Sequence, residues 1–277
     1  MTTSMTDEMN KTAAGSYANV NGLNIYYEIH GTGGNPLVLL HGGFMNIDSL
    51  GPILPALAET RQVIAVELEG HGRTADLDRP LSYEQMAEDV ANLVRQLGIN
   101  QVDVFGFSMG GMVALRMAMQ QPDLVRKLVA ASAPYSQDGY YPSIVAQWPG
   151  VSPEGFAGTP MEQIYAQTAP NPEHWPVFIA KVKHTMMNFK GWSPEEIQSI
   201  KAPTLLIVGD ADLIRPEHVL EIFHLLGGAR EDGGMGELPS SQLAVLPGTT
   251  HFNILYRTDL LLPIITPFLD APIPEGK

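Results

Sequence analysis

The chain has 277 residues, of which 44% are hydrophobic and 17% charged, as is typical of a globular protein long enough to bury a large core. Its formal net charge of −14 argues against nucleic acid and anionic membranes as partners, because both select clusters of Lys and Arg. The sequence has no cysteine, which excludes disulfides, thiol catalysis and cysteine-ligated metals and is consistent with a cytoplasmic location.

The amino-terminal residues 1–15 are polar, and we expect them to form a flexible tail rather than a signal peptide or a membrane anchor. No apolar run in the chain approaches the roughly 18 residues that a membrane span needs. Next, Ser16–Val20 and Leu23–Ile29 flank Asn21-Gly22, a strong signal for a two-residue hairpin turn.

Short apolar runs then alternate with helical patterns. The runs that predict strands are Pro36–Leu40, Gln62–Leu68, Gln101–Phe107, Lys127–Ala131, Thr204–Gly209 and Gln242–Leu246. The patterns that predict helices are Leu50–Glu59, Ser82–Leu97, Met109–Gln121, Glu217–Leu226 and Thr258–Leu269, and Ser82 with Gln85 matches a capping box. Continuous apolar strands between helices indicate an α/β protein with a mainly parallel central sheet and helices on both faces.

Residues 134–200 interrupt this alternation, because they are rich in Pro and aromatic residues and contain no convincing core strand. Helices are expected there around Met161–Thr168, His174–Asn188 and Ser193–Ile200. We therefore expect a core formed by residues 16–133 and 201–277, with 134–200 inserted as a helical cap. The Gly-rich stretch Gly227–Ser241 is expected to be a mobile surface loop.

Residues 106–110 (GFSMG) fit the pattern G-x-S-x-G, with an apolar strand directly before them and an apolar helix directly after. This strand–turn–helix context is the one that a nucleophile elbow needs, and it makes Ser108 the candidate nucleophile. The backbone passes close to the turn on either side, so the positions two before and two after Ser108 must be glycine. The turn also directs the amide of Met109 and the amino terminus of the following helix at a developing oxyanion.

A serine hydroxyl needs an adjacent base, and His251 is the best-placed histidine because it follows the strand Gln242–Leu246 through a short loop. The acid that orients this histidine should follow the strand Thr204–Gly209, where Asp210 and Asp212 both stand. Spacing alone leaves the choice between the two aspartates open.

Four segments together resemble the α/β-hydrolase superfamily: residues 39–43 (LLHGG), 70–74 (GHGRT), 106–110 (GFSMG) and 209–212 (GDAD). The chain is similar in particular to small carboxylesterases, lactonases, cofactor-free haloperoxidases and carbon–carbon bond hydrolases. The resemblance implies that Asp212 is the acid. It also implies that the amides of Gly43, with Phe44 as the fallback, and of Met109 form the oxyanion hole. One departure is Glu67, where such proteins usually carry Asp.

The reaction that this resemblance implies is hydrolysis of a small carboxylic ester through an acyl-enzyme, with no metal and no organic cofactor. A lactone or a perhydrolysis reaction would use the same Ser108, His251 and Asp212, and a hydrolase-like receptor that binds without turnover is a further alternative. Epoxide hydrolases and haloalkane dehalogenases are disfavoured because they use Asp where Ser108 stands. Large cap residues that could contact an apolar substrate are Trp148, Trp175, Met186 and Trp192. The oligomeric state cannot be read from the sequence.

Overall fold

The computed structural model describes residues 15–231 and 238–273. The tail expected over residues 1–15 therefore lies outside the described residues except for Gly15, and the loop expected over 227–241 is described only at its two ends.

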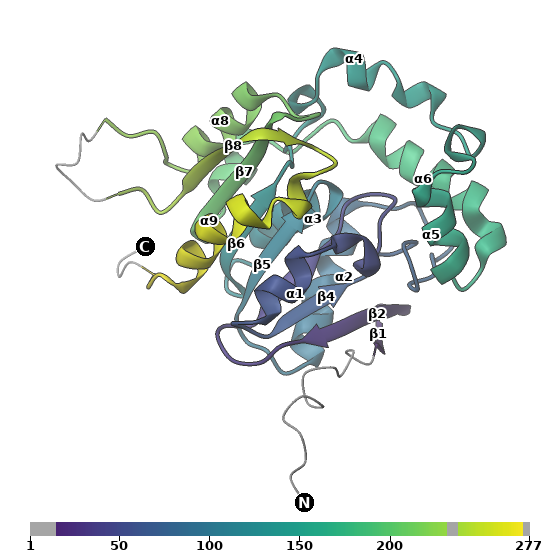
Figure 1. The fold of residues 1–277 in the computed structure, drawn as a ribbon, viewed down its shortest axis with the longest axis horizontal. Helices are drawn as coiled ribbons and strands as arrows, with labels where there is room; N and C mark the ends of the chain where they lie inside the picture. The colour runs from purple at the N-terminus through teal and green to yellow at the C-terminus, as the bar shows by residue number, and fades with distance from the viewer. Residues whose placement is uncertain (1–14, 232–237, 274–277) are drawn as a thin grey trace, which may run out of the picture.

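Eight strands form one sheet in the order β1-β2-β4-β3-β5-β6-β7-β8 (Figure 1). The strands are β1 (Ser16–Val20), β2 (Leu23–His30), β3 (Leu37–Leu40), β4 (Val63–Val66), β5 (Val102–Phe107), β6 (Val125–Ala131), β7 (Thr204–Ala211) and β8 (Gln242–Thr250). Neighbouring strands from β4 to β8 pair in parallel, whereas β1 pairs antiparallel with β2 and β2 antiparallel with β4. The predicted mainly parallel sheet with an antiparallel hairpin at one edge is confirmed.

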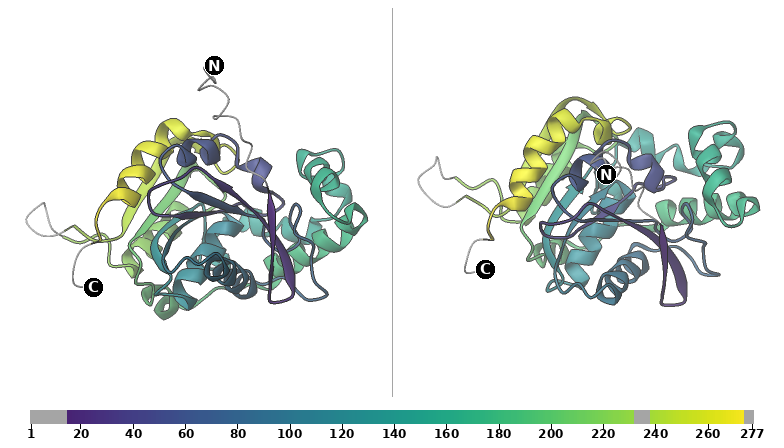
Figure 2. Two further views of the ribbon diagram at one scale, coloured as in Figure 1. Left: turned by 90° about the horizontal axis from the view of Figure 1, so that it is seen from below. Right: turned by 60° about the horizontal axis from the view of Figure 1, so that its bottom comes forward.

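Helices cover both faces of the sheet (Figure 2). They are α1 (Ile53–Ala58), α2 (Tyr83–Gln96), α3 (Met109–Gln120), α4 (Pro142–Val145), α5 (Pro160–Thr168), α6 (Trp175–Asn188), α7 (Pro194–Gln198), α8 (Pro216–Leu225) and α9 (Thr258–Asp270). Side chains alternate between the two faces of a strand, so Val38 and Leu40 pack with the core of α2, α3 and α8, while Leu37 and Leu39 pack with that of α1 and α9.

The ends of α2 follow from its sequence. The Ser82 hydroxyl accepts a hydrogen bond from the Gln85 amide at 3.2 Å, and Gly98 adopts the left-handed conformation (φ 76°) that ends the helix. The predicted capping box is only half formed, because the Gln85 side chain donates to Asp89 at 3.0 Å instead of returning to Ser82. In a full capping box the Gln85 side-chain oxygen would accept the Ser82 N–H, but the side chain points along the helix, where its amide N–H donates to the buried Asp89 carboxylate.

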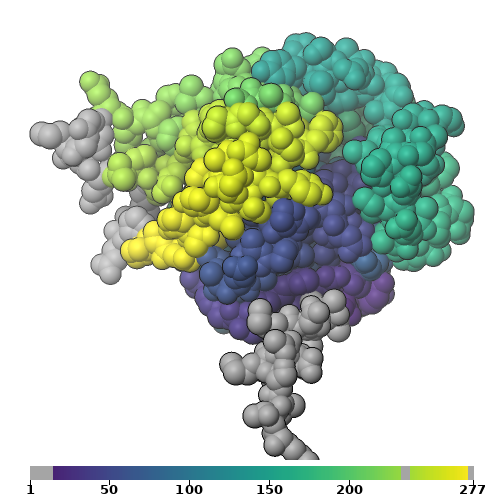
Figure 3. All heavy atoms as spheres, viewed as in Figure 1, coloured from purple at the N-terminus to yellow at the C-terminus, as the bar shows by residue number. Residues whose placement is uncertain are grey.

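Residues 134–200, all of them described, contain helices α4 to α7 and no strand beyond two isolated bridges. The short helix α4 was not expected from the sequence. In Figure 3 the teal atoms of this segment pack directly against the rest of the molecule. None of the helices within the described ranges has the length and apolar character needed to cross a membrane.

Candidate active site

Ser108 occupies the turn between β5 and α3, with φ 54° and ψ −118°. Few non-glycine residues adopt a positive φ, so the fold holds this residue in a strained conformation. The adjacent glycines make the turn possible. A Cβ on Gly106 would lie 2.1 Å from the carbonyl oxygen of Gly110, and one on Gly110 would lie 2.4 Å from that of His41. The turn therefore presents the serine hydroxyl at the amino terminus of α3, as the sequence context predicts.

His251 immediately follows β8 and faces Ser108. Its Nε2 lies 3.1 Å from the Ser108 Oγ, and its Nδ1 lies 2.7 Å from Oδ1 of Asp212. His251 is 7% exposed, and its ring centroid lies 5.0 Å from that of Phe107. Ser108, His251 and Asp212 are thus joined by consecutive hydrogen bonds, and we refer to these three side chains as the relay.

Asp212 follows β7 and is fixed by bonds from both sides. Its Oδ1 also accepts the amides of Leu213 at 2.7 Å and Ile214 at 3.2 Å, and its Oδ2 accepts the Ser132 hydroxyl at 2.5 Å. Burial opposes ionisation of this carboxyl, but the hydrogen bonds from His251, Ser132 and the backbone lower its pKa below the ordinary value. The carboxylate is therefore ionised at neutral pH.

Asp210 has a different position. It is exposed, and its two carboxylate oxygens accept the amides of Gly248 at 2.9 Å and Thr249 at 3.0 Å. Asp210 thus ties β7 to the end of β8, and the structure places Asp212 rather than Asp210 against His251.

A cavity of about 230 Å³ lies beside the serine and histidine of the relay. It is lined by Gly43, Phe44, Tyr83, Ser108, Met109, Tyr140, Ile144, Trp148, Phe156, Met161, Val182, Met186, Leu213, His251 and Phe252. The three residues expected to form an oxyanion hole, Gly43, Phe44 and Met109, are therefore at the same cavity as the Ser108 hydroxyl. Met109 is also the first residue of α3, where backbone N–H groups have no partner within the helix.

Of the four large residues expected to contact a substrate, Trp148 and Met186 line this cavity and Trp175 and Trp192 do not. Trp175 packs among the rings of Phe156, Tyr165 and Phe178 within the 134–200 segment. Trp192 packs at 6.0 Å from the Tyr83 ring and donates its indole N–H to Glu84 at 2.8 Å.

The sequence reasoning missed several lining residues and one polar partner of the relay. Leu213 and Phe252 directly follow Asp212 and His251, so adjacency in the chain could have indicated them. Ser132, which donates to Asp212, also follows a strand end and has a positive φ of 52°. Tyr83 and Tyr140 gave no signal in the sequence, because they come from separate elements that only the tertiary structure brings together.

Glu67, the departure from the family pattern, is fully buried at the end of β4. It accepts the Ile47 amide at 3.3 Å and pairs with the Arg73 guanidinium at 2.6 Å. A Cβ on Gly72 would lie 2.3 Å from its Oε2. Glu67 therefore holds together the loops that follow β3 and β4, and it does not contact the relay.

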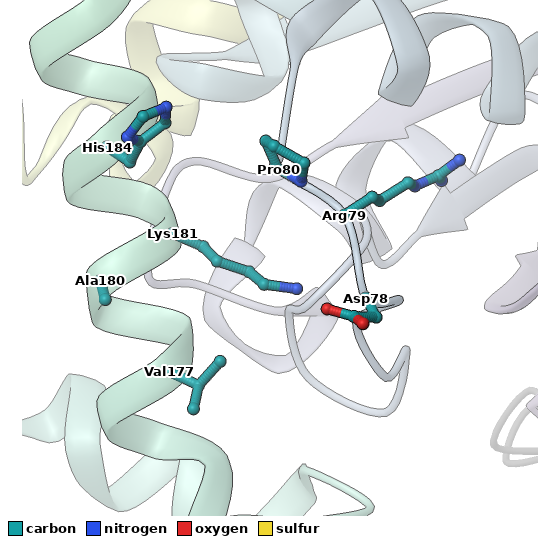
Figure 4. Close-up of a pocket in the computed structure, with 7 residues that line it drawn as sticks. All are labelled: Asp78, Arg79, Pro80, Val177, Ala180, Lys181 and His184. Carbon is teal, nitrogen blue, oxygen red and sulfur yellow. The ribbon is translucent and has the colours of Figure 1, made fainter.

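A second hollow of about 480 Å³ lies between α6 and the loop that follows β4 (Figure 4). Ser108, Asp212 and His251 do not line it. Both of its cations are already paired, Lys181 with Asp76 at 2.5 Å and Arg79 with Asp89 at 2.8 Å. Among the residues that the structure describes, no three His, Asp or Glu side chains are grouped as a metal site would require. The smaller cavity at Ser108 is therefore the candidate active site.

Comparison with known proteins agrees with the fold. The sequence model of the alpha/beta hydrolase family matches residues 37–261, and the chain belongs to this family. It is 24% identical over 274 residues to the uncharacterized hydrolase YugF of Bacillus subtilis, an alignment that covers 90% of this chain and 96% of that protein.

Two further similarities concern one relative by sequence and one solved structure. The chain is 37% identical over 136 residues to a pimeloyl-[acyl-carrier protein] methyl ester esterase of Yersinia pestis, and this match spans 48% of each chain. The crystal structure of the enol-lactonase from Burkholderia xenovorans superposes with a TM-score of 0.68 at 20% identity, covering 92% of this chain and 100% of that one. The family and these relatives identify the chain as an α/β-fold hydrolase.

Proposed function

We propose that the chain is a carboxylic ester hydrolase in which Ser108 forms an acyl-enzyme. The observation that carries the proposal is the relay with spacings of 3.1 Å and 2.7 Å, which opens into an apolar cavity. The esterase named among the relatives supports the same reaction class. Residues 134–200 act in this proposal as a cap that covers the cavity, since they supply Trp148, Phe156 and Met186 to its lining.

The spacings of the relay support the following proposed mechanism. The Ser108 Oγ attacks the ester carbonyl carbon while Nε2 of His251 takes its proton. Asp212 holds the Nδ1–H tautomer and stabilises the imidazolium that forms. The amides of Met109 and of Gly43, with Phe44 as the fallback, donate to the oxyanion. His251 then protonates the leaving alcohol, and it activates the water that hydrolyses the acyl-enzyme. None of these steps requires a metal or an organic cofactor.

A lactone is a cyclic ester that the same residues would attack in the same way, and perhydrolysis would replace water by peroxide in the second step. The structural similarity to an enol-lactonase favours the lactone as the second candidate substrate. We place the reaction in the cytoplasm on the composition alone.

The test compares the purified chain with its Ser108→Ala variant on short p-nitrophenyl esters and on a panel of lactones. Loss of the nucleophile should lower kcat by several orders of magnitude without unfolding the protein. Ser199→Ala, at an exposed serine, is the matched control and should retain full activity. A fluorophosphonate should label Ser108, as read by mass spectrometry of the tryptic peptide. Activity of Ser108→Ala within tenfold of the parent would refute the assignment, and absence of turnover on every substrate would favour a receptor.

A further inference from the structure

The walls of the cavity at Ser108 carry no formal charge apart from the relay. None of the lining residues given by the described part of the chain is Lys, Arg, Asp or Glu. A carboxylate taken into such a site would lose its hydration without gaining a cation, which costs several kcal/mol. With a volume of about 230 Å³ the cavity is also smaller than the roughly 300–1,000 Å³ of sites for drug-sized ligands. Such a cavity is suited to a small, uncharged occupant.

The cavity nevertheless has a polar wall. Tyr83, in the first turn of α2, is 4% exposed, and its ring packs edge-on against Phe189 at 4.8 Å. Within the described residues its hydroxyl makes no hydrogen bond, and it is not among the fully buried polar atoms that lack a partner, so it remains accessible. Tyr83 lines the cavity, so a hydroxyl that is accessible there and bonded to no protein group is suited to meet an acceptor on a ligand.

Tyr140 provides a second hydroxyl at the same cavity. Its ring packs edge-on against Trp148 at 5.0 Å, and its hydroxyl has the Met112 sulfur at 3.8 Å as its contact. A thioether is a weak acceptor, so this hydroxyl can also donate elsewhere. Burial raises the pKa of both phenols, and the Tyr140 phenol is close enough to raise that of Tyr83 further. Both groups are therefore neutral donors at physiological pH, and both line the same cavity.

We propose that the Tyr83 and Tyr140 hydroxyls form a polar subsite that donates hydrogen bonds to an uncharged carbonyl oxygen at the non-reacting end of the substrate. This inference rests on the proposed ester hydrolysis and specifies its substrate class, a small neutral oxo-ester or oxo-lactone. The hydrophobic walls hold the carbon chain, and the two phenols select the second oxygen.

Three methyl esters of almost identical shape test the inference: methyl 5-oxohexanoate, methyl 5-methylhexanoate and monomethyl glutarate. They end in a ketone, a branched alkyl group and an ionised carboxylate, respectively. The comparison is repeated with methyl esters that carry the ketone at carbon 4, 6 or 7, and with acetates of hydroxyketones of matching length. Varying the distance between the ester and the ketone ensures that one member of the series reaches the subsite. Hydrolysis of each methyl ester is followed by release of methanol, and hydrolysis of each acetate by release of acetic acid. For that member we expect kcat/KM about tenfold above that of its alkyl partner, and at least a hundredfold above that of the carboxylate.

Two variants assign the preference to the tyrosines. Tyr83→Phe and Tyr140→Phe should each reduce the ratio of kcat/KM for ketone over alkyl ester by severalfold. Tyr165→Phe is the matched control, because Tyr165 is a buried tyrosine of the 134–200 segment that does not line the cavity. It should leave the ratio unchanged, and circular dichroism verifies the fold of each variant.

The possible outcomes are distinct. Equal hydrolysis of ketone and alkyl esters at every chain length would overturn the subsite while leaving the proposed esterase function intact. A ketone preference that survives both substitutions would also overturn it. If no ester of any kind is hydrolysed, the proposed function fails and the subsite fails with it.

Discussion

Asp212 accepts hydrogen bonds from five groups, and this pattern determines how the Asp212→Asn variant should behave. Oδ1 faces His251 and the amides of Leu213 and Ile214, whereas Oδ2 faces the Ser132 hydroxyl and, at 3.3 Å, the Gly209 amide. An asparagine should keep its single oxygen toward the three donors on the first side. The imidazole would then keep its orientation, and the variant would lose mainly the negative charge that stabilises the imidazolium.

The size of this loss can be worked from the geometry. With the Nδ1 and Oδ1 atoms 2.7 Å apart, the centres of the two charges are about 4 Å apart, and at an effective dielectric constant of about 20 they attract by about 4 kcal/mol. Since each 1.36 kcal/mol changes a rate tenfold, kcat should fall by roughly 10³. The measurement is kcat on one p-nitrophenyl ester at saturating substrate, with circular dichroism to verify folding.

Asp210→Asn is the matched control, because it makes the same change two residues away. Asp210 holds the Gly248 and Thr249 amides just before His251, so this variant should lose thermal stability but keep kcat within about tenfold of the parent. If Asp210→Asn were inactive while Asp212→Asn retained activity, the assignment of the acid would be wrong.

Two further predictions concern stability. Burial, and for His71 also the nearby His41, lowers the pKa of His41 to about 4 and of His71 to about 3. In the unfolded chain the histidine pKa is about 6.5, so as the pH falls these histidines bind protons in the unfolded state before they do so in the folded state. Each of the two should therefore lower the unfolding free energy by about 2 kcal/mol between pH 6.5 and pH 5. Urea denaturation at pH 6.5 and pH 5 measures how much the unfolding free energy changes between the two. This change should be about 2 kcal/mol smaller in His71→Asn than in the parent, and the same as in the parent in His184→Asn, a control at an exposed position. An equal change in the parent and in His71→Asn would contradict the prediction. Lys127→Met should lower the unfolding free energy by about 3 kcal/mol, because the buried Lys127 ammonium donates to three carbonyls at the end of α9, including those of Phe268 at 2.6 Å and Leu269 at 3.1 Å. If Lys127→Met had the same denaturation midpoint as the parent, these hydrogen bonds would make no net contribution to the unfolding free energy.

Elements whose signals are local could be predicted from the amino-acid sequence. The Asn21-Gly22 hairpin, the helix after Ser82 and the turn at Ser108 each depend on residues within one or two turns of the chain, so periodicity, caps and glycine placement were sufficient to predict them. The alternation of apolar strands and helices likewise predicted the parallel sheet. Because parallel strands place their carboxyl ends along one edge, the same pattern placed Ser108 and His251 together.

Tertiary structure decided what depends on register and packing. The sequence ended the strand before the two aspartates at Gly209, but β7 continues to Ala211 with a register shift against β8. Asp210 therefore lies within the strand and bonds β8, while Asp212 lies beyond it and reaches His251, a distinction that spacing could not make.

The lining of the cavity was decided in the same way. Residue size alone suggested the tryptophans, yet Trp175 and Trp192 pack within aromatic clusters while Tyr83 and Tyr140 line the cavity. Whether a large side chain lines a cavity or packs in the core depends on all the residues that surround it in the folded protein. Those neighbours come from α2, from the loop after β6 and from α6, and only the folded chain brings them together.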